Sequence, residues 1–198
     1  MLNISQKSIA PTWKTSRKAL WAASIAVIVL LNGCAAATRE DRRSVGTAID
    51  DQNIELQVID RIFSSELIGE ESHIKVEAYE GVVLLMGETT DEERRDLAGK
   101  LAGEVNMVKR VVNEIVVAPN ATMGQRANNT WLTFKVNTAL VKNNPIPGFD
   151  ATRINVSSSQ GTIYLMGAVT HKEGDAVADV VRNVSGVKKV VKVFEYVD

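Results

Sequence analysis

The second half of the chain alternates between spacings of apolar residues that are typical of helices and of strands. It opens with apolar residues four positions apart, which lie on one face of a helix: Leu132, Val136 and Leu140. Two short strand-like runs follow, 154–158 and 162–166, and the glycine in the segment between them predicts a β-hairpin. A second helical pattern and a β-branched run at 190–197 complete the order α-β-β-α-β.

The first half of the chain repeats this pattern. At an offset of 80 residues, Ile74 corresponds to Ile154, Gly81 to Gly161 and Leu85-Met86-Gly87 to Leu165-Met166-Gly167. The first copy has a helix that carries Ile54, Val58 and Ile62, strands at 74–78, 82–86 and 111–117, and a helix before the last strand. A repeat of this length indicates one structural unit used twice.

In both copies the second helix is preceded by a Thr followed three residues later by a Glu. These pairs are Thr90 and Glu93, and Thr170 and Glu173. Each predicts a capping box, in which the two side chains bind the unpaired N–H groups at a helix start.

The predicted fold class is α+β, with two tandem domains at 53–117 and 130–198. A copy of about 65 residues can form only a marginal core, with two helices over one face of a three-stranded sheet. The segment 118–129 is rich in Asn, Ala, Gly and Pro and predicts a linker. The polar segment that precedes the first domain, up to residue 52, predicts a tether.

The first 33 residues have the features of a secretory signal peptide. The run Ala19–Leu31 is uncharged and apolar, and it follows Lys14, Arg17 and Lys18. Thirteen residues are fewer than the ~20 that span a bilayer, which favours a signal peptide over a membrane helix. The following Leu31-Asn32-Gly33-Cys34 resembles a lipobox, so residues 34–52 are expected to be an acylated N-terminus and tether, with Cys34 as the lipidation site.

Charge distinguishes the two copies from each other. The whole chain has a formal net charge of −1, which becomes −5 when the four basic residues of the signal peptide are removed. The first copy holds seven Lys or Arg against fourteen Asp or Glu, while the second holds eight against six. An acidic protein is a poor nucleic-acid binder, and only the second copy can approach an anionic membrane without net repulsion.

The opening helix of the second copy carries a candidate lipid-binding face. Projected at 100° per residue, one side of this helix holds the core residues and the other side holds the candidates: Trp131, Phe134, Lys135, Thr138, Val141 and Lys142. Aromatic rings and lysines together suit the interface of an anionic membrane. The corresponding helix of the first copy has Asp60 in place of Thr138 and neither lysine.

Two alternatives remain open for this region of the second copy. Trp131 and Phe134 are expected either to face lipid or to pack against the first domain or the linker. The apolar loop Pro145-Ile146-Pro147-Gly148-Phe149 is expected either to enter lipid beside the helix or to act as a rigid connector.

The repeated order and its closing segments resemble the BON domain family. The matching features are the stretches from Gly81 to Gly87 and from Gly161 to Gly167, and the closing Val-Lys-Arg-Val-Val and Val-Lys-Lys-Val-Val segments. Two such domains behind a lipobox resemble the dual-BON lipoproteins of the outer membrane. The resemblance implies mixed sheets and a lipid-anchored protein on the periplasmic face of the outer membrane. It also implies support of envelope integrity, binding of anionic phospholipid and enrichment at the division site.

No arrangement of residues in the sequence predicts catalysis, a cofactor or a metal site. With one cysteine and two histidines, the chain lacks the usual ligand clusters, and His73 and His171 are expected to have surface or capping roles. We therefore expect a non-enzymatic protein. The alternatives to lipid binding are an adaptor, whose acidic first domain engages an envelope protein, and a passive structural lipoprotein.

Overall fold

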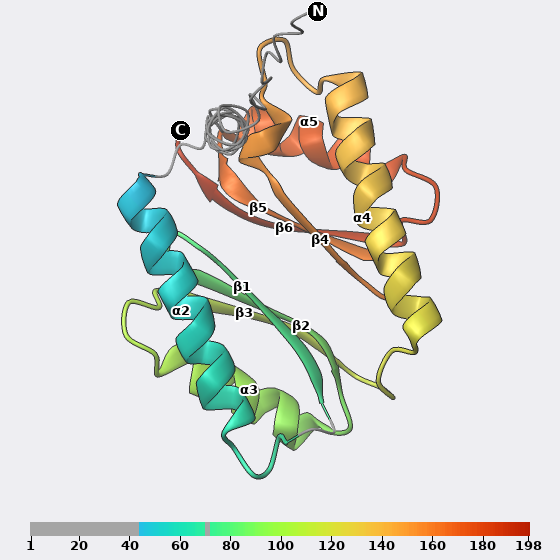
Figure 1. The fold of residues 1–198 in the computed structure, drawn as a ribbon. Helices are drawn as coiled ribbons and strands as arrows, with labels where there is room; N and C mark the ends of the chain where they lie inside the picture. The colour runs from blue at the N-terminus through green and yellow to red at the C-terminus, as the bar shows by residue number, and fades with distance from the viewer. Residues whose placement is uncertain (1–43, 70–71) are drawn as a thin grey trace, which may run out of the picture. The chain divides into compact units, whose positions relative to one another are not determined.

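The computed structural model describes residues 44–69 and 72–198, which hold both copies of the repeat (Figure 1). The elements of the first copy are α2 (Val45–Phe63), β1 (His73–Tyr79), β2 (Val82–Thr89), α3 (Glu92–Gly103) and β3 (Arg110–Val117). Those of the second are α4 (Met123–Asn143), the short 3₁₀ helix η1 (Ala151–Arg153), β4 (Asn155–Ser159), β5 (Thr162–Val169), α5 (His171–Arg182) and β6 (Lys189–Tyr196). The predicted signal peptide (1–33) and Cys34 lie outside the described residues.

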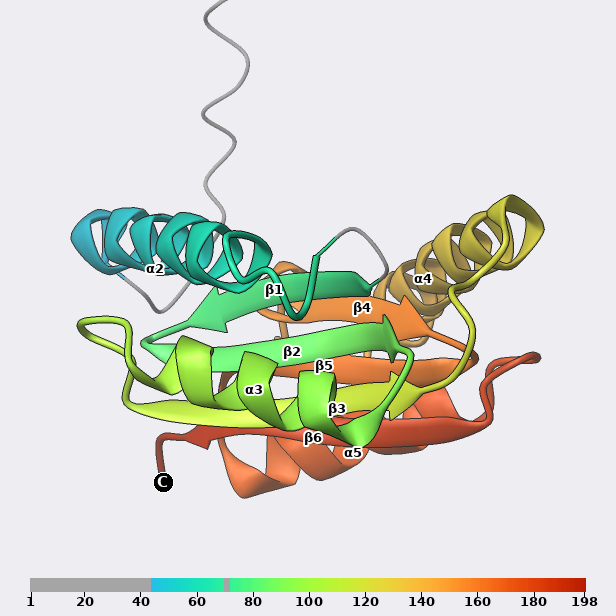
Figure 2. The same cartoon turned by 90° about the horizontal axis from the view of Figure 1, so that it is seen from below.

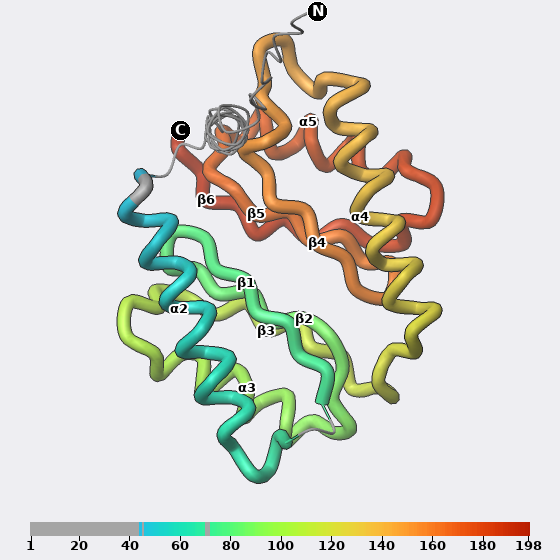
Figure 3. The backbone as a smooth tube through the Cα atoms, viewed as in Figure 1, coloured from blue at the N-terminus to red at the C-terminus, as the bar shows by residue number. Residues whose placement is uncertain are grey.

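Each copy forms one three-stranded mixed sheet. The middle strand, β2 or β5, pairs antiparallel with the strand before it and parallel with the closing strand, a path that can be followed in Figure 3. Both hairpins turn through two residues with positive φ, 50° and 80° at Glu80 and Gly81 and 51° and 85° at Gln160 and Gly161. Such turns match the twist of the strands they join. The α+β class and the α-β-β-α-β order are confirmed.

Two helices begin inside segments that the sequence predicted to be a tether and a linker. α2 begins at Val45, inside the expected tether 34–52, and α4 begins at Met123, inside the expected linker 118–129. Ser44 caps α2 by accepting the N–H of Thr47 at 3.0 Å, and Thr122 begins a capping box for α4. The polar residues of these first helical turns face solvent, so their composition resembles that of a loop. The connection between the copies is therefore short, 118–122.

The two predicted capping boxes had different outcomes. At α5, Thr170 accepts the N–H of Glu173 at 3.2 Å, and the Glu173 carboxylate accepts the N–H of Thr170 at 2.7 Å, as predicted. At α3, however, the cap is Asp91, whose carboxylate accepts the N–H of Arg94 at 2.9 Å. The helix therefore begins one residue later than the Thr90 capping box required.

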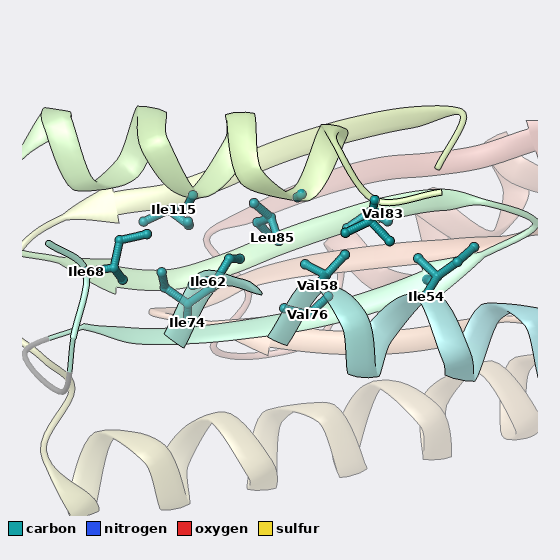
Figure 4. Close-up of a cluster of buried hydrophobic side chains, with 13 residues drawn as sticks. Ile54, Val58, Ile62, Ile68, Ile74, Val76, Val83, Leu85 and Ile115 are labelled. Atoms are coloured by element: carbon teal, nitrogen blue, oxygen red, sulfur yellow. The ribbon is translucent and has the colours of Figure 1, made fainter. Parts of the chain in front are cut away.

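Each copy has its own core between its helices and the inner side of its sheet. In the first copy, Ile54, Val58 and Ile62 of α2 point toward Val83 and Leu85 of β2, as Figure 4 shows. In the second, the equivalent Leu132, Val136 and Leu140 pack with residues of β5 and α5. The predicted helical spacing therefore identified the core face of both helices.

A third core lies between the two sheets and joins the copies. Every residue of β2 is buried, because one side of the strand packs on helices and the other packs on the second sheet. The joint cluster consists of Tyr79, Val82, Leu84, Met86, Tyr164, Met166, Ala168 and Val193. In Figure 2, α2 and α3 lie on the outer side of one sheet and α4 and α5 on the outer side of the other. The sheet face that the sequence left unassigned is thus buried by the other copy.

Polar contacts across this interface follow the offset of 80 residues. The backbone N–H of Ala168 donates to the Tyr79 hydroxyl oxygen at 3.0 Å. Their repeat equivalents, Ser159 and Glu88, also contact each other, with the Ser159 hydroxyl 3.4 Å from the carboxylate. Glu77 accepts a hydrogen bond from its own equivalent, Ser157. Equivalent residues therefore meet about an approximate two-fold axis, as in an isologous dimer.

Candidate functional site

The candidate lipid-binding residues lie on the outward side of α4. Trp131 and Phe134 are each 57% exposed, and Val141 is 71% exposed. The two rings stack on each other, with centroids 5.2 Å apart and planes inclined by 21°. Their exposure rules out the alternative in which both rings are buried against the first domain or the linker. α4 thus presents an aromatic pair and an aliphatic side chain to its surroundings.

The two lysines beside these rings differ in their surroundings. Lys142 lies exposed in the last turn of α4, where a cation is also favoured by the helix dipole. Lys135 is partly buried, and its ammonium group donates to the backbone carbonyl of Ser185 in the loop after α5. Lys142 is therefore the more accessible cation of the predicted pair.

A shallow groove of about 480 Å³ runs between α4 and α5 beside the aromatic pair. Phe134, Lys135, Thr138 and Lys142 line it from α4, and Val180 and Val184 line it near the end of α5. The two valines were not predicted to belong to the site. Both are partly buried against the core of the second copy, and the packing of α5 against α4 places them on the groove wall.

Thr138 is on the predicted face, but its hydroxyl proton is already used. The hydroxyl donates to the backbone carbonyl of Phe134 at 2.8 Å. This is the common bond of a Thr to the preceding helical turn. Thr138 therefore lines the groove with its methyl group and does not offer it a hydrogen-bond donor.

The loop after α4 is a connector that packs into the fold. Phe149 is 9% exposed and belongs to the second core, and Ile146 packs against the same cluster. The N–H of Phe149 donates to the carbonyl of Ile146 at 2.9 Å, which closes the turn. Of the two alternatives for this loop, the buried side chains favour the rigid connector.

The first copy also turns apolar residues outward, which the sequence comparison underestimated. On α2, Leu56 is 66% exposed and Phe63 is 41% exposed. They correspond to Phe134 and Val141 of α4. The equivalent groove, of about 400 Å³ between α2 and α3, is lined by the opposite charges of Asp60 and Arg61, by uncharged polar side chains, and by Leu101 and Val105. The copies therefore share outward apolar residues and differ in charge.

Both histidines make structural contacts. Nδ1 of His73 lies 3.0 Å from the buried Glu88 carboxylate, next to the interface between the copies. His171 stacks on Tyr196, with ring centroids 3.9 Å apart, and Nδ1 lies 2.6 Å from the Asp198 carboxylate. Hydrogen bonding to His171 lowers the pKa of Asp198.

Comparison with known proteins places this geometry in a family. The BON domain pattern matches residues 50–119 and 128–198. The chain is 34% identical over 174 residues to the outer membrane lipoprotein DolP of Haemophilus influenzae, covering 88% of this chain and 89% of that protein. It is 34% identical over 157 residues to a 21 kDa hemolysin of Actinobacillus pleuropneumoniae, covering 79% of each protein.

The comparison with solved structures gives a match of low similarity. It is the C-terminal domain of CdsD, a structural protein of the type III secretion system of Chlamydia trachomatis. It is 13% identical, with a TM-score of 0.30, and the match covers 72% of this chain and 98% of that chain.

Proposed function

The chain belongs to the BON domain family, and from this premise we propose that it is an outer-membrane lipoprotein that binds anionic phospholipid through the outward face of α4. In this proposal Cys34 carries the acyl chains and the two copies lie on the periplasmic side of the membrane. The name of the Haemophilus influenzae relative and the lipobox-like segment before Cys34 support the anchor. Support of envelope integrity and enrichment at the division site belong to the proposal through the family resemblance.

The proposal is carried by the exposed Trp131–Phe134 stack and by Lys142, which lies on the same side of α4 about two turns beyond Phe134. Within residues 44–69 and 72–198, no helix has the length and apolar composition to cross a bilayer. In this proposal the contact made by these side chains is interfacial, with the rings at the level of the headgroups and the ammonium near phosphate.

The expected contact is weak without the anchor. A basic residue near an anionic surface contributes ~1 kcal/mol, and a large apolar side chain contributes ~1.5–3 kcal/mol when it is fully buried. Trp131 and Phe134 are already partly covered, so each has less area to gain. Acylation keeps the lipid at a high local concentration, which makes a weak contact effective.

Co-sedimentation with vesicles tests the proposal on residues 40–198, which form one compact unit. We expect this fragment to bind vesicles that contain phosphatidylglycerol and not vesicles of phosphatidylcholine alone. Trp131 is the one tryptophan in the sequence of this fragment, so a blue shift of its fluorescence reports directly on α4. Binding that is indifferent to anionic lipid would disprove the mechanism.

The repeat supplies a matched pair of variants for the same assay. Phe134→Glu and Leu56→Glu place a carboxylate at equivalent, exposed positions of α4 and α2. We expect Phe134→Glu to abolish co-sedimentation and Leu56→Glu to leave it unchanged. Equal losses in both variants would contradict a specific role for α4.

A second candidate function is favoured by the exposed apolar residues of α2. Leu56 and Phe63 lie on an acidic helix that carries Asp50 and Asp60, a chemistry that suits a basic protein surface better than an anionic membrane. In this candidate the first copy is an adaptor for an envelope protein. Crosslinking in intact cells, lost in Leu56→Glu and kept in Phe134→Glu, would favour the adaptor.

A further inference from the structure

The first copy shows how the hairpin turn of this fold binds a carboxylate. Asp51 of α2 is buried, and its two carboxylate oxygens accept the N–H groups of Glu80 and Gly81, each at 2.9 Å. Both turn residues have positive φ, and Asp51 is therefore the acceptor for two consecutive N–H groups of the turn.

The second copy has the same turn and lacks the carboxylate. Gln160 and Gly161 repeat the φ values of Glu80 and Gly81 within about 5°. The helix offset that aligns Ile54 with Leu132 places Asn129 at the position of Asp51. In the described part of the chain, the structure records no hydrogen bond to the N–H groups of Gln160 and Gly161.

Asn129 is buried but does not replace Asp51 as the acceptor. It is 7% exposed, and its backbone carbonyl accepts the hydroxyl of Ser158 at 2.6 Å. Its side-chain amide has no recorded hydrogen bond among residues 44–69 and 72–198. Within the described residues, no side-chain nitrogen or oxygen that is sealed from solvent lacks a hydrogen bond. The Asn129 amide is therefore reached by solvent and is free to bond to a ligand.

Asn129 and the turn line the same cleft, which has a volume of about 560 Å³. The other walls are the connection between the copies, the first turns of α4 and the loop that holds Gly186 and Lys188. None of the lining residues, all within the described chain, is Asp or Glu. Among these lining residues only Lys188 is charged, so the cleft is positively charged.

Lys188 supplies the positive charge of this cleft. Its side chain passes over the turn, so that its Cδ lies 2.9 Å from the position a Cβ would take at Gly161, and within the described residues no ion pair is recorded for it. The nearby Glu88 carboxylate accepts from the Gln160 side chain at 3.1 Å and from Ser159 at 3.4 Å, but it does not line the cleft.

We propose that this cleft binds the carboxylate of a small ligand, with the N–H groups of Gln160 and Gly161 as donors. The two N–H groups donate hydrogen bonds to the ligand carboxylate, as those of Glu80 and Gly81 do to the Asp51 carboxylate. The Asn129 amide donates to the ligand from the floor of the cleft, and Lys188 balances the charge. A peptide C-terminus and a sugar acid share this chemistry, and both have further hydrogen-bonding groups for the amide-rich walls.

NMR titration of ¹⁵N-labelled residues 40–198 tests the site. The probes are N-acetyl-triglycine, the same peptide with a C-terminal amide, glucuronate and inorganic phosphate. We expect saturable shifts of the Gln160 and Gly161 amide signals with the free carboxylates and none with the amidated peptide. Tighter binding of triglycine assigns a peptide C-terminus as the ligand, and tighter binding of glucuronate assigns a sugar acid.

The decisive variant is Asn129→Asp, which gives the second copy the residue of the first. Its carboxylate is expected to occupy the turn, to shift the Gln160 and Gly161 signals without any ligand, and to weaken carboxylate binding by about tenfold or more. The variant is expected to melt no lower than the parent chain, because it gains two hydrogen bonds. Lys188→Gln, on the surface, is expected to weaken binding without changing the turn signals of the unliganded protein.

Several results would overturn the proposal. These are equal binding of the amidated peptide, tighter binding of phosphate than of either carboxylate, and unchanged binding in Asn129→Asp. The absence of saturable shifts with both carboxylates would have the same meaning. Vesicle binding through α4 does not involve these residues, so the two tests succeed or fail separately.

Discussion

Gly87 shows at the scale of one residue how closely the strands of this fold approach each other. Its φ is 122°, and a Cβ built there would lie 2.0 Å from the backbone carbonyl oxygen of His73. The equivalent Gly167 has a φ of 155°, and its Cβ would lie 2.7 Å from the carbonyl oxygen of Arg153. The sequence showed that the two glycines correspond, but the backbone contact that requires them is a property of the folded hairpin.

Gly87→Ala is expected to lower the free energy of unfolding by ~3 kcal/mol or more, because backbone strain and overlap with a neighbouring strand combine. Urea denaturation of residues 40–198 measures this loss. Gly46→Ala, in the first turn of α2, is the control, since a Cβ there would lie at an ordinary contact distance of 3.6 Å from the Ser44 Oγ. A similar loss in both variants would show that the strand contact is not the cause.

At the scale of elements, the helix starts test how far local sequence determines structure. Thr170 and Thr90 occur in the same sequence pattern, but only Thr170 caps its helix. The sequence pattern predicted Thr90 as the cap of α3, and the structure uses the next residue, Asp91, instead. The same limit applies to α2 and α4, whose exposed first turns have the composition of linkers.

Thr170→Ala is expected to lower the free energy of unfolding by ~1 kcal/mol, because it removes a capping side chain. Thr90→Ala is expected to have less than half of this effect, since Asp91 keeps its bond to the N–H of Arg94. Urea unfolding of both variants under identical conditions gives the comparison. Equal effects would mean that Thr90 contributes to the start of α3 as much as Thr170 does to that of α5.

The sequence of α4 alone predicts some features of the candidate lipid-binding face and not others. Helical periodicity alone placed Trp131, Phe134 and Val141 on the outward side of α4, and their exposure agrees with this. The bond from Lys135 to Ser185 and the valine wall from α5 depend on how two distant segments pack. Neither has a signal in the sequence of α4.

At the scale of the whole molecule, the joint core between the sheets makes the two copies one folding unit. Leu84 is fully buried in this cluster, so the first copy lacks a covered sheet face without the second. The sequence held one signal for this interface, the uninterrupted apolar run 82–86, which is typical of a strand buried on both sides. The sequence of the strand does not identify the surface that covers it.

Leu84→Ala is expected to cost ~2–5 kcal/mol and to lower the stability of both copies together. Urea unfolding followed by Trp131 fluorescence reports on the second copy, although the substitution lies in the first. We expect its midpoint to fall and to coincide with the midpoint from circular dichroism. An unchanged Trp131 transition would show that the copies unfold independently.

Glu77 is expected to make the interface sensitive to pH. Burial raises the pKa of its carboxyl above the usual value of 4.5, Glu55 raises the pKa further, and the Ser157 hydroxyl and Lys75 act in the opposite direction. The folded state therefore holds this proton more tightly than the unfolded state, so its contribution to stability is lost as pH rises from 4.5 through the raised pKa.

Glu77→Gln removes this titration. Relative to the parent chain, the variant is expected to gain stability as the pH increases from 4.5, the unfolded-state pKa, to about 7. Thermal melting of both proteins across this range measures their difference in stability. The exposed carboxyls are the same in both proteins, so their titration does not contribute to this difference. A difference that stays constant with pH would contradict the assignment to Glu77.

The two copies are related by an approximate two-fold axis but belong to one chain, so their surface residues can change independently. In a symmetric pair of separate subunits, every substitution occurs on both sides, so an acidic helix on one side demands an acidic helix on the other. Because the segment 118–122 joins the two copies in one chain, a substitution occurs in one copy only. The joint core between the sheets can keep its two-fold arrangement while the outer surfaces differ. One half can then carry lysines next to aromatic rings while its counterpart accumulates carboxylates, and a single scaffold offers two surfaces of opposite electrical character.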